Sequence, residues 1–256
     1  MAHGELTPQD LAEHLDQLLD ASRDKDFGPN GLQVDGRRPI RHIVTGVSAC
    51  SELFERARDA GADAVLVHHG LFWEGLPRQL TGAQYRRVAT LIDAGMALFA
   101  YHLPLDRHAE LGNNVLAAKR LGLYSLEPFG LYQGIPIGFR GRYPEPLPSG
   151  ELVDRLRLTF EREPLAFLSG PDPISTVGII SGGAQGELYQ AIAAGLDAYV
   201  TGEASEWVMN VARENHIHYF ACGHYATERL GIRALGEHLA ERFGLAHDFI
   251  DVPNPV

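Results

Sequence analysis

A short apolar run in this chain ends in two adjacent histidines and a glycine. Residues 65–67 are Val-Leu-Val, and His68, His69 and Gly70 follow directly. The length and apolar character of the run are typical of a buried strand, and the glycine permits a sharp change of direction after it. In open α/β sheets, ligands bind at the carboxyl ends of the strands. The pattern therefore predicts a strand that delivers two imidazoles to a ligand-binding edge.

The histidine pair alone has two interpretations. The first is structural, with both rings packed against Phe72 and Trp73. The second is a metal site, because imidazole is the commonest metal ligand among side chains. Neighbouring residues of a strand point to opposite faces, so two such histidines suit two neighbouring ions better than one. The rest of the chain has to decide between these interpretations.

Composition and charge narrow the class of protein. The 256 residues suffice for one large domain or two modest ones. A net charge of -11 argues against nucleic acid as a partner, because nonspecific affinity for phosphates comes mostly from Lys and Arg. The two cysteines, Cys50 and Cys222, give no disulfide framework, which favours a reducing compartment. Residues 1–6 lack a signal-peptide pattern and no apolar run reaches about 18 residues, so we expect a cytoplasmic protein with no membrane partner.

Strand and helix patterns alternate along the first half of the chain. Alternation of this kind predicts βαβ units and a largely parallel sheet. Ser48 suits the N-cap of the helix that follows the first strong strand. Turn-forming residues at 26–34 predict a loop that leads into an edge strand, and we interpret them as turn chemistry. The strand patterns cover 40–47, 65–67 and 96–101, and the helix patterns begin at Thr7-Pro8, after Ser48 and near Tyr85.

A third imidazole and a carboxylate follow the strand at 96–101. His102 comes directly after it, and Asp106 lies four residues further on. Pro104 suits the first turn of a helix between them, which would turn Asp106 back toward the edge of the sheet. The strand pattern thus adds two more candidate ligands to the same edge.

The second half of the chain repeats the first. The segment 45–67 has a counterpart in 178–201, and Gly202 and Glu203 stand where the first copy has its histidine pair. In the second copy, His224 and Glu228 repeat the spacing of His102 and Asp106. We infer an internal duplication.

The duplication predicts the domain organisation. We expect two similar α/β/α lobes with mixed, largely parallel sheets. Residues 129–148 are rich in Gly, Pro and aromatic residues and predict a domain boundary before a helix over 149–162. The predicted lobes are residues 1–126 plus 229–256, and residues 127–228.

His224 and Glu228 begin a segment with helical spacing of apolar residues. A spacing of four residues places an imidazole and a carboxylate on one side of a helix, as metal-binding helices do. A hydrogen bond on the helix surface is the alternative interpretation. The apolar stripe consists of Leu230, Ala234, Leu235, Leu239 and Phe243.

Together these patterns select a set of five side chains: His68, His69, Asp106, His224 and Glu228. Three imidazoles and two carboxylates are too many for one tetrahedral ion but suit two divalent ions that share a carboxylate. Nitrogen and oxygen ligands without thiolate favour Zn, Fe, Mn or Co and do not choose among them. The sequence therefore predicts a dinuclear metal centre.

Several of these motifs closely resemble the YbgI family, whose members are also called Nif-three-like proteins or GTP cyclohydrolase I type-two homologues. The resemblance implies two similar α/β lobes, a dinuclear metal centre in the cleft between them, and a ring-shaped homohexamer. It maps the ligands onto the five residues above, with Glu228 as the bridge and His102 close by. It covers nearly the whole chain and is carried by residues 68–73, 101–106, 112–114, 201–203 and 223–228.

Two functions of different classes follow. The first is a metal-dependent hydrolase that cleaves a C–N bond or a phosphoester in a nucleotide-like small molecule. His102 and Glu203 are then candidates for proton transfer or for support of the ligands, and no catalytic residue is identified. No P-loop is present to bind GTP phosphates. The alternative is a noncatalytic metal-binding adaptor or metal-delivery protein.

Overall fold

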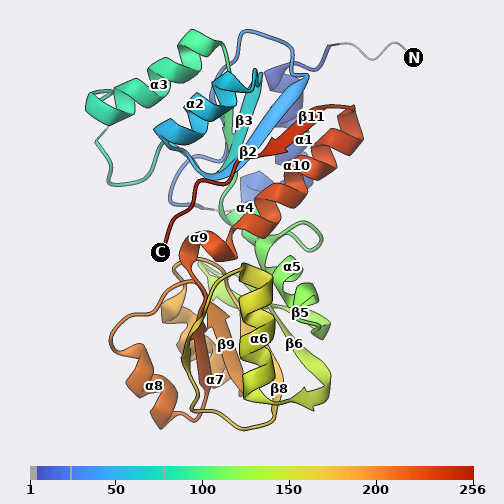
Figure 1. Cartoon of the computed structure of the whole chain (residues 1–256), viewed down its shortest axis with the longest axis vertical. Helices are drawn as coiled ribbons and strands as arrows, with labels where there is room; N and C mark the ends of the chain where they lie inside the picture. The colour runs from blue at the N-terminus through green and yellow to red at the C-terminus, as the bar shows by residue number, and fades with distance from the viewer. Residues whose placement is uncertain (1–4, 24, 78) are drawn as a thin grey trace. The chain divides into compact units, whose positions relative to one another are not determined.

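The computed structural model describes residues 5–23, 25–77 and 79–256. Residues 1–4, part of the segment in which the sequence analysis looked for a signal peptide, lie outside the described residues. The chain folds into two compact units (Figure 1). Unit 1 comprises the residues up to Leu105 together with Ile232–Val252, and unit 2 comprises Asp106–Gly231 and Pro253–Val256. The boundaries of these units differ from those of the lobes expected from the repeat, which are 1–126 plus 229–256 and 127–228. The division into those lobes stays a prediction.

Unit 1 contains a five-stranded sheet in the order β1-β4-β3-β2-β11. Strands β4, β3, β2 and β11 are parallel neighbours, and only β1 at the edge runs antiparallel. The parallel strands and the edge position of β1 agree with the sequence prediction. The strands are β1 (Gly31–Val34), β2 (His42–Ser48), β3 (Ala64–His69), β4 (Ala97–Ala100) and β11 (Ala246–Phe249).

Helices cover both faces of this sheet. On one face, apolar residues of α2 and α3 pack with strand residues such as Val65, Val67 and Leu98 in one core cluster. On the other, α1 and α10 meet where the His14 ring lies against His238. The helices of unit 1 are α1 (Pro8–Leu19), η1 (Ala21–Arg23), α2 (Ser51–Asp59), α3 (Gly82–Ala94) and, shared with unit 2, α4 (Leu103–Asp106) and α10 (Arg229–Phe243).

Two local details of unit 1 test the predicted helix starts. Thr7 caps α1 as expected, since its hydroxyl accepts a hydrogen bond from the backbone N–H of Asp10 and the Asp10 carboxylate accepts one from Thr7 in return. The predicted N-cap at Ser48 is wrong. Ser48 is the last residue of β2, and Cys50 precedes the helix without a side-chain cap. The Ser48 hydroxyl bonds to His69 instead, 3.0 Å away, so the polar residue belongs to the end of the sheet.

Unit 2 contains a six-stranded sheet in the order β5-β6-β8-β9-β10-β7. Strands β8, β9 and β10 are parallel, and the other pairs are antiparallel. The Gly- and Pro-rich segment at 129–148 lies largely in the long hairpin of β5 and β6, in which Gly138 meets the edge of β8 so closely that a Cβ would contact the Ile179 carbonyl. The strands are β5 (Tyr124–Tyr132), β6 (Ile135–Leu147), β7 (Leu165–Phe167), β8 (Ile174–Ile179), β9 (Ala198–Thr201) and β10 (His218–Ala221).

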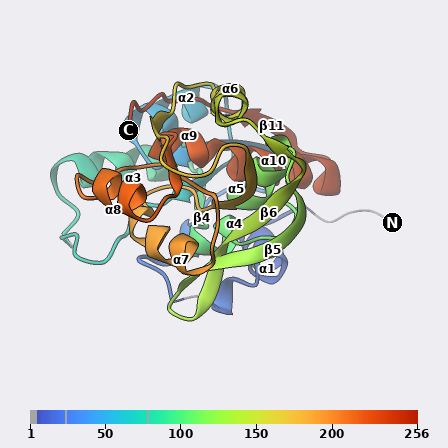
Figure 2. The same cartoon turned by 90° about the horizontal axis from the view of Figure 1, so that it is seen from below.

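The faces of this second sheet are also covered by helices, α6 on one side and α7 on the other (Figure 2). Leu152 and Leu156 of α6 share a core cluster with Val177 and Val200. The residue before Val200 in β9, Tyr199, points to the opposite face, where α7 contacts the strand. The helices are α5 (Asn113–Arg120), α6 (Ser149–Phe160), η2 (Gln185–Glu187), α7 (Leu188–Ala193), α8 (Val208–Glu214) and α9 (His224–Thr227). Among the described residues, no helix is long and apolar enough to cross a membrane.

At one residue of the edge strand β5, a side chain forms hydrogen bonds with the exposed backbone groups. The Gln190 amide of α7 accepts a hydrogen bond from the Leu131 backbone N–H at 2.7 Å and donates one to the Leu131 carbonyl at 3.0 Å. Both backbone groups of Leu131 are therefore bound by one amide from the same unit.

Each unit uses one aspartate to hold the start of a strand. In unit 1, the Asp63 carboxylate accepts hydrogen bonds from the backbone N–H groups of Arg41 and His42, at 3.0 and 3.1 Å. In unit 2, Asp197 accepts bonds from two consecutive backbone N–H groups that open β8, at 2.8 and 2.9 Å. The predicted repeat pairs these two aspartates, and the same contact is present at both.

We predict that Asp63→Ala and Asp197→Ala each lower the free energy of unfolding by about 1–3 kcal/mol, because each change removes the acceptor for two half-buried backbone donors. Urea denaturation followed by circular dichroism measures the effect. Asp59→Ala is the control, because the Asp59 side chain is 68% exposed and pairs with its neighbour Arg58 on the surface of α2. Equal midpoints for the three variants would contradict the anchoring role.

Candidate metal site

Three histidines gather at the carboxyl ends of β3 and β4 in unit 1. His68 and His69 are the last two residues of β3, and His102 follows β4. The centroids of their rings lie 4.8 to 5.5 Å apart. One nitrogen from each ring lies within 4.8 Å of the other two, which is close enough for the group to hold an ion. The strand-end edge predicted from the sequence thus collects three imidazoles.

The hydrogen bonds of these rings determine which nitrogen carries the lone pair. His68 is buried, and its Nδ1 lies 3.1 Å from the carbonyl oxygen of Tyr101. His102 Nδ1 lies 2.7 Å from the Asp26 carboxylate. A carbonyl and a carboxylate only accept, so in both neutral rings the hydrogen is on Nδ1 and the lone pair on Nε2. His69 Nδ1 contacts the Ser48 hydroxyl, which can donate or accept.

Unit 2 contains a buried carboxylate, Asp106, whose position is fixed by amides. Its Oδ1 accepts hydrogen bonds from the Asn113 side chain at 2.8 Å and from the Ser181 hydroxyl at 3.0 Å. Asn114 donates to the backbone carbonyl of Asp106 and accepts from the Ser181 N–H. The two asparagines open α5, so Asp106 is held by the start of this helix and by the segment that follows β8.

Unit 2 also contains a histidine–carboxylate pair, His224 at the start of α9 and Glu228 just after it. His224 Nε2 is 3.3 Å from Glu228 Oε1, so the predicted spacing of four residues does bring the two side chains together. On the other side of the ring, His224 Nδ1 is 2.6 Å from the Glu203 carboxylate. Glu228 is 2% exposed. An imidazole held by a carboxylate on Nδ1, with a second carboxylate beside Nε2, has the arrangement of a supported metal ligand.

Charge in this group favours a cation. Burial lowers the pKa of His224, but the hydrogen bonds and charges of Glu228 and Glu203 outweigh burial and raise that pKa to about 9. The carboxylates therefore favour positive charge at this ring. In unit 1, burial raises the pKa of Asp26, and the bonds from His102, Asn30 and the Phe27 N–H outweigh it and lower the pKa below its ordinary value.

A glycine makes room for Glu228. Gly182 has a φ of +69°, and a Cβ built on it would lie 2.3 Å from Glu228 Oε1 and 3.2 Å from His224 Nε2. Its N–H donates to the Thr227 hydroxyl at 3.0 Å. The Gly182 backbone thus passes directly beside the two candidate ligands, which no larger residue would permit.

The five predicted ligands are divided among the histidine cluster of unit 1, the His224–Glu228 pair of unit 2 and the separately held Asp106. Unit 1 brings His68, His69 and His102 together, and unit 2 brings His224, Glu203 and Glu228 together and fixes Asp106 separately. The residues are nitrogen and oxygen donors without thiolate, which fits a site for Zn, Fe, Mn or Co.

Sequence reasoning missed the side chains that hold these groups. They are Asp26, Asn30, Ser48, Asn113, Asn114, Ser181 and Thr227. The sequence indicates Asn113 and Asn114 only through the family resemblance, and it predicts turn chemistry at residues 26–34. The one available signal was polarity at the ends of strands or at a helix start, which turns and caps also produce.

Comparison with known proteins gives a consistent match along the chain. The protein family described as Duf34/NIF3 (NGG1p interacting factor 3) matches residues 6–255 of this chain. A Pseudomonas aeruginosa protein called GTP cyclohydrolase 1 type 2 homolog is 47% identical over 245 residues, which are 96% of this chain and 97% of the relative. The Escherichia coli K12 protein of the same name is 40% identical over 247 residues, 96% and 98% of the two chains.

Solved structures of similar proteins also match nearly the whole chain. The structure of "protein ybgI, unknown function" superposes with a TM-score of 0.93 at 39% identity, covering 98% of this chain and all of that one. TTHA1606 from Thermus thermophilus gives a TM-score of 0.89 at 37% identity, with the same coverage. Reduced HcgD from Methanocaldococcus jannaschii, at 20% identity and a TM-score of 0.83 over 96% and 98% of the two chains, shares the fold.

The close approach at Gly182 yields a test of the unit 2 group. We predict that Gly182→Ala weakens Zn²⁺ binding at least tenfold in isothermal titration, because the new methyl group displaces Glu228. Gly195→Ala is the matched control, since Gly195 has a φ of +66° and no atom within 4 Å of an added Cβ. Both variants should lose about 1–2 kcal/mol of stability through backbone strain. Equal Zn²⁺ affinity in the two variants would refute the crowding at Glu228.

Proposed function

Given that this chain belongs to the Duf34/NIF3 family, we propose that it is a metal-dependent hydrolase with a dinuclear centre. The proposed ligands are His68, His69, Asp106, His224 and Glu228. The proposed substrate is a small nucleotide-like molecule that is opened at a C–N bond or cleaved at a phosphoester. The name shared by the relatives, GTP cyclohydrolase 1 type 2 homolog, supports a nucleotide-like substrate.

One observation carries the metal part of this proposal: the site histidines are bonded to the protein through Nδ1. Tyr101 O accepts from His68, and Glu203 accepts from His224. When one nitrogen is bonded in this way, the tautomer and the ring orientation are fixed and Nε2 is the nitrogen that can ligate.

The ligands would divide between two ions. We assign His68 and Asp106 to one ion and His69 and His224 to the other, with Glu228 shared. When bound, two divalent ions lower the pKa of a water and polarise the bond that the water attacks, which is the chemistry of many hydrolases. The protein's own part is to orient the ligands through Ser48, Asn113 and Ser181 and to keep Glu203 beside His224.

Turnover by metal-replete protein tests the enzymatic part. The protein is stripped with a chelator, reloaded separately with Zn²⁺, Mn²⁺, Co²⁺ or Fe²⁺, and incubated with nucleoside triphosphates and with p-nitrophenyl phosphate. We expect hydrolysis with at least one metal and none in the stripped protein. A His224→Ala variant controls for contaminating hydrolases. If no loaded form acts on either substrate class while the metal is bound, the function is that of a noncatalytic metal-binding protein.

We predict that Glu228→Gln lowers occupancy of both ions, whereas His68→Ala leaves one ion in place. A carboxylate offers two oxygens and one negative charge to two ions, while an imidazole offers one nitrogen to one ion. The amide keeps the size of the side chain, so the variant should fold. Elemental analysis and Zn²⁺ titration count the ions. Two ions bound by Glu228→Gln at wild-type affinity would show that this carboxylate is not shared.

We also propose a homohexameric ring, which the resemblance implies, and a cytoplasmic location, which is expected because the two cysteines give no disulfide framework. Size-exclusion chromatography with light scattering measures the assembly directly.

A further inference from the structure

The loop before β1 reaches the histidine cluster of unit 1 through a buried carboxylate. Asp26 lies on this loop, and its side chain is 2% exposed. Its Oδ1 is 2.7 Å from His102 Nδ1, and its Oδ2 accepts a bond from the backbone N–H of Leu103 at 3.0 Å. Asn30, also on the loop, accepts from the His102 backbone N–H at 2.8 Å. Two loop residues thus hold both the ring and the backbone of His102.

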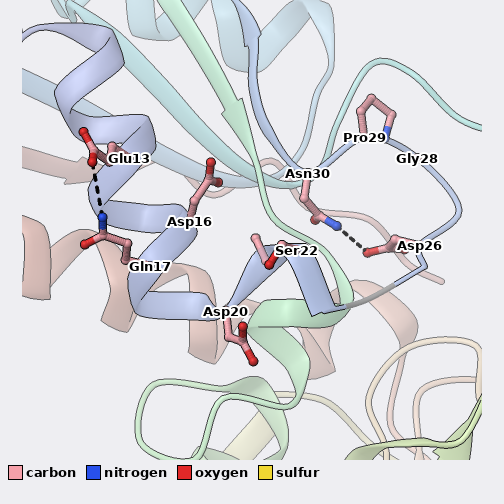
Figure 3. A pocket seen from close by; sticks show the side chains of 10 residues that line it. Glu13, Asp16, Gln17, Asp20, Ser22, Asp26, Gly28, Pro29 and Asn30 are labelled. Carbon is pink, nitrogen blue, oxygen red and sulfur yellow. Dashed lines mark hydrogen bonds between the residues drawn. The ribbon is translucent and has the colours of Figure 1, made fainter.

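The donors around Asp26 leave no choice of hydrogen-bond direction. Oδ1 also accepts from the Phe27 N–H at 2.7 Å, and Oδ2 also accepts from the Asn30 side chain at 3.0 Å. Asn30 cannot reverse its amide without losing the bond from His102. Figure 3 shows the Asn30–Asp26 bond in the wall of a cavity of about 760 Å³. Asp26 is therefore surrounded by donors, and the His102 ring is one of them.

The held ring faces the candidate ligands. Its centroid lies 5.0 Å from that of His68 and 5.5 Å from that of His69. The Trp73 ring packs edge-on against it at 5.1 Å. The ring is thus fixed on one side by Asp26, on another by Trp73, and is turned toward the imidazoles of β3.

We propose that Asp26 is a positioning residue that fixes His102 in the Nδ1–H tautomer. The lone pair of Nε2 is then available to a metal ion held by His68 and His69. This inference rests on the proposed function for the role of the cluster, but the tautomer itself does not depend on bound metal. Asp26 then does for His102 what Glu203 does for His224, in which a carboxylate also accepts from Nδ1.

A purely structural role for Asp26 is the competing explanation. In that case the carboxylate only closes the loop by accepting from the N–H groups of Phe27 and Leu103. The two explanations differ in what happens to the His102 ring when the charge is removed. A loop-closing residue leaves the tautomer of His102 unchanged, whereas a positioning residue determines it.

Asp26→Asn distinguishes them, because the amide must turn its NH₂ toward a donor. If the NH₂ replaces Oδ2, it faces two donors, Leu103 N–H and the Asn30 amide, and gains no acceptor. If it replaces Oδ1, it faces one donor, Phe27 N–H, and can donate to His102 Nδ1 once that nitrogen loses its hydrogen. The second orientation is favoured, and it forces His102 into the Nε2–H tautomer.

The readout is the ¹⁵N chemical shift of the histidine rings in metal-free protein at about pH 8, where an ordinary imidazole is neutral. His102→Gln identifies the signals of His102 by their loss. We expect mainly Nδ1–H in the wild type and mainly Nε2–H in Asp26→Asn. Asp16→Asn is the matched control, because Asp16 lines the same cavity but accepts from the Tyr101 hydroxyl, and it should leave the tautomer of His102 unchanged.

Each outcome decides the proposal. An Nε2–H tautomer in the wild type overturns it even if Asp26→Asn fails to fold, and so does an unchanged tautomer in a folded variant. Zn²⁺ titration separates this proposal from the proposed function: we expect a 10- to 100-fold weaker affinity in Asp26→Asn than in Asp16→Asn. If the wild type binds no divalent metal, the proposed function fails, and the proposed support of the cluster fails with it, while a switch of tautomer would still establish Asp26 as the residue that sets it.

Discussion

An imidazole in a protein interior has two nitrogens with opposite hydrogen-bond roles, and the group bonded to one determines the role of the other. In this chain the determining groups are a backbone carbonyl for His68 and carboxylates for His102 and His224. None of the three can donate, so each fixes a hydrogen on Nδ1. The groups that fix the three rings come from the residue after β4, the loop before β1 and the segment after β9.

The fold was predictable where local chemistry and periodicity agree. The helix start at Thr7-Pro8, the apolar run before His68 and the alternation of strands and helices all predicted elements that the structure contains. The candidate ligands were predictable because they follow strand ends or share one side of a helix turn. The two-lobe duplication and the dinuclear centre remain predictions, although Asp63 and Asp197 make the same contact in both units.

The remaining features depend on contacts between residues distant in the sequence. Asp26 and His102 are 76 positions apart, and Ser181 and Asp106 are 75 apart. A polar residue in a loop is usually turn chemistry, and nothing local distinguishes Asp26 from that. Ser48 failed as a predicted cap for the same reason, because a serine after a strand can bond to the next helix or to the neighbouring strand. The partner, and not the residue type, decides its role.

The Gln190 amide of α7 covers one residue of the exposed edge of β5. An exposed edge strand is a template on which another chain can add a strand and so begin aggregation. At Leu131, which is itself 56% exposed, the backbone donor and acceptor are already bound by Gln190. A foreign strand would have to displace that amide before it could continue the ladder. Gln190 therefore occupies, at this residue, the backbone groups through which another strand would add to the sheet.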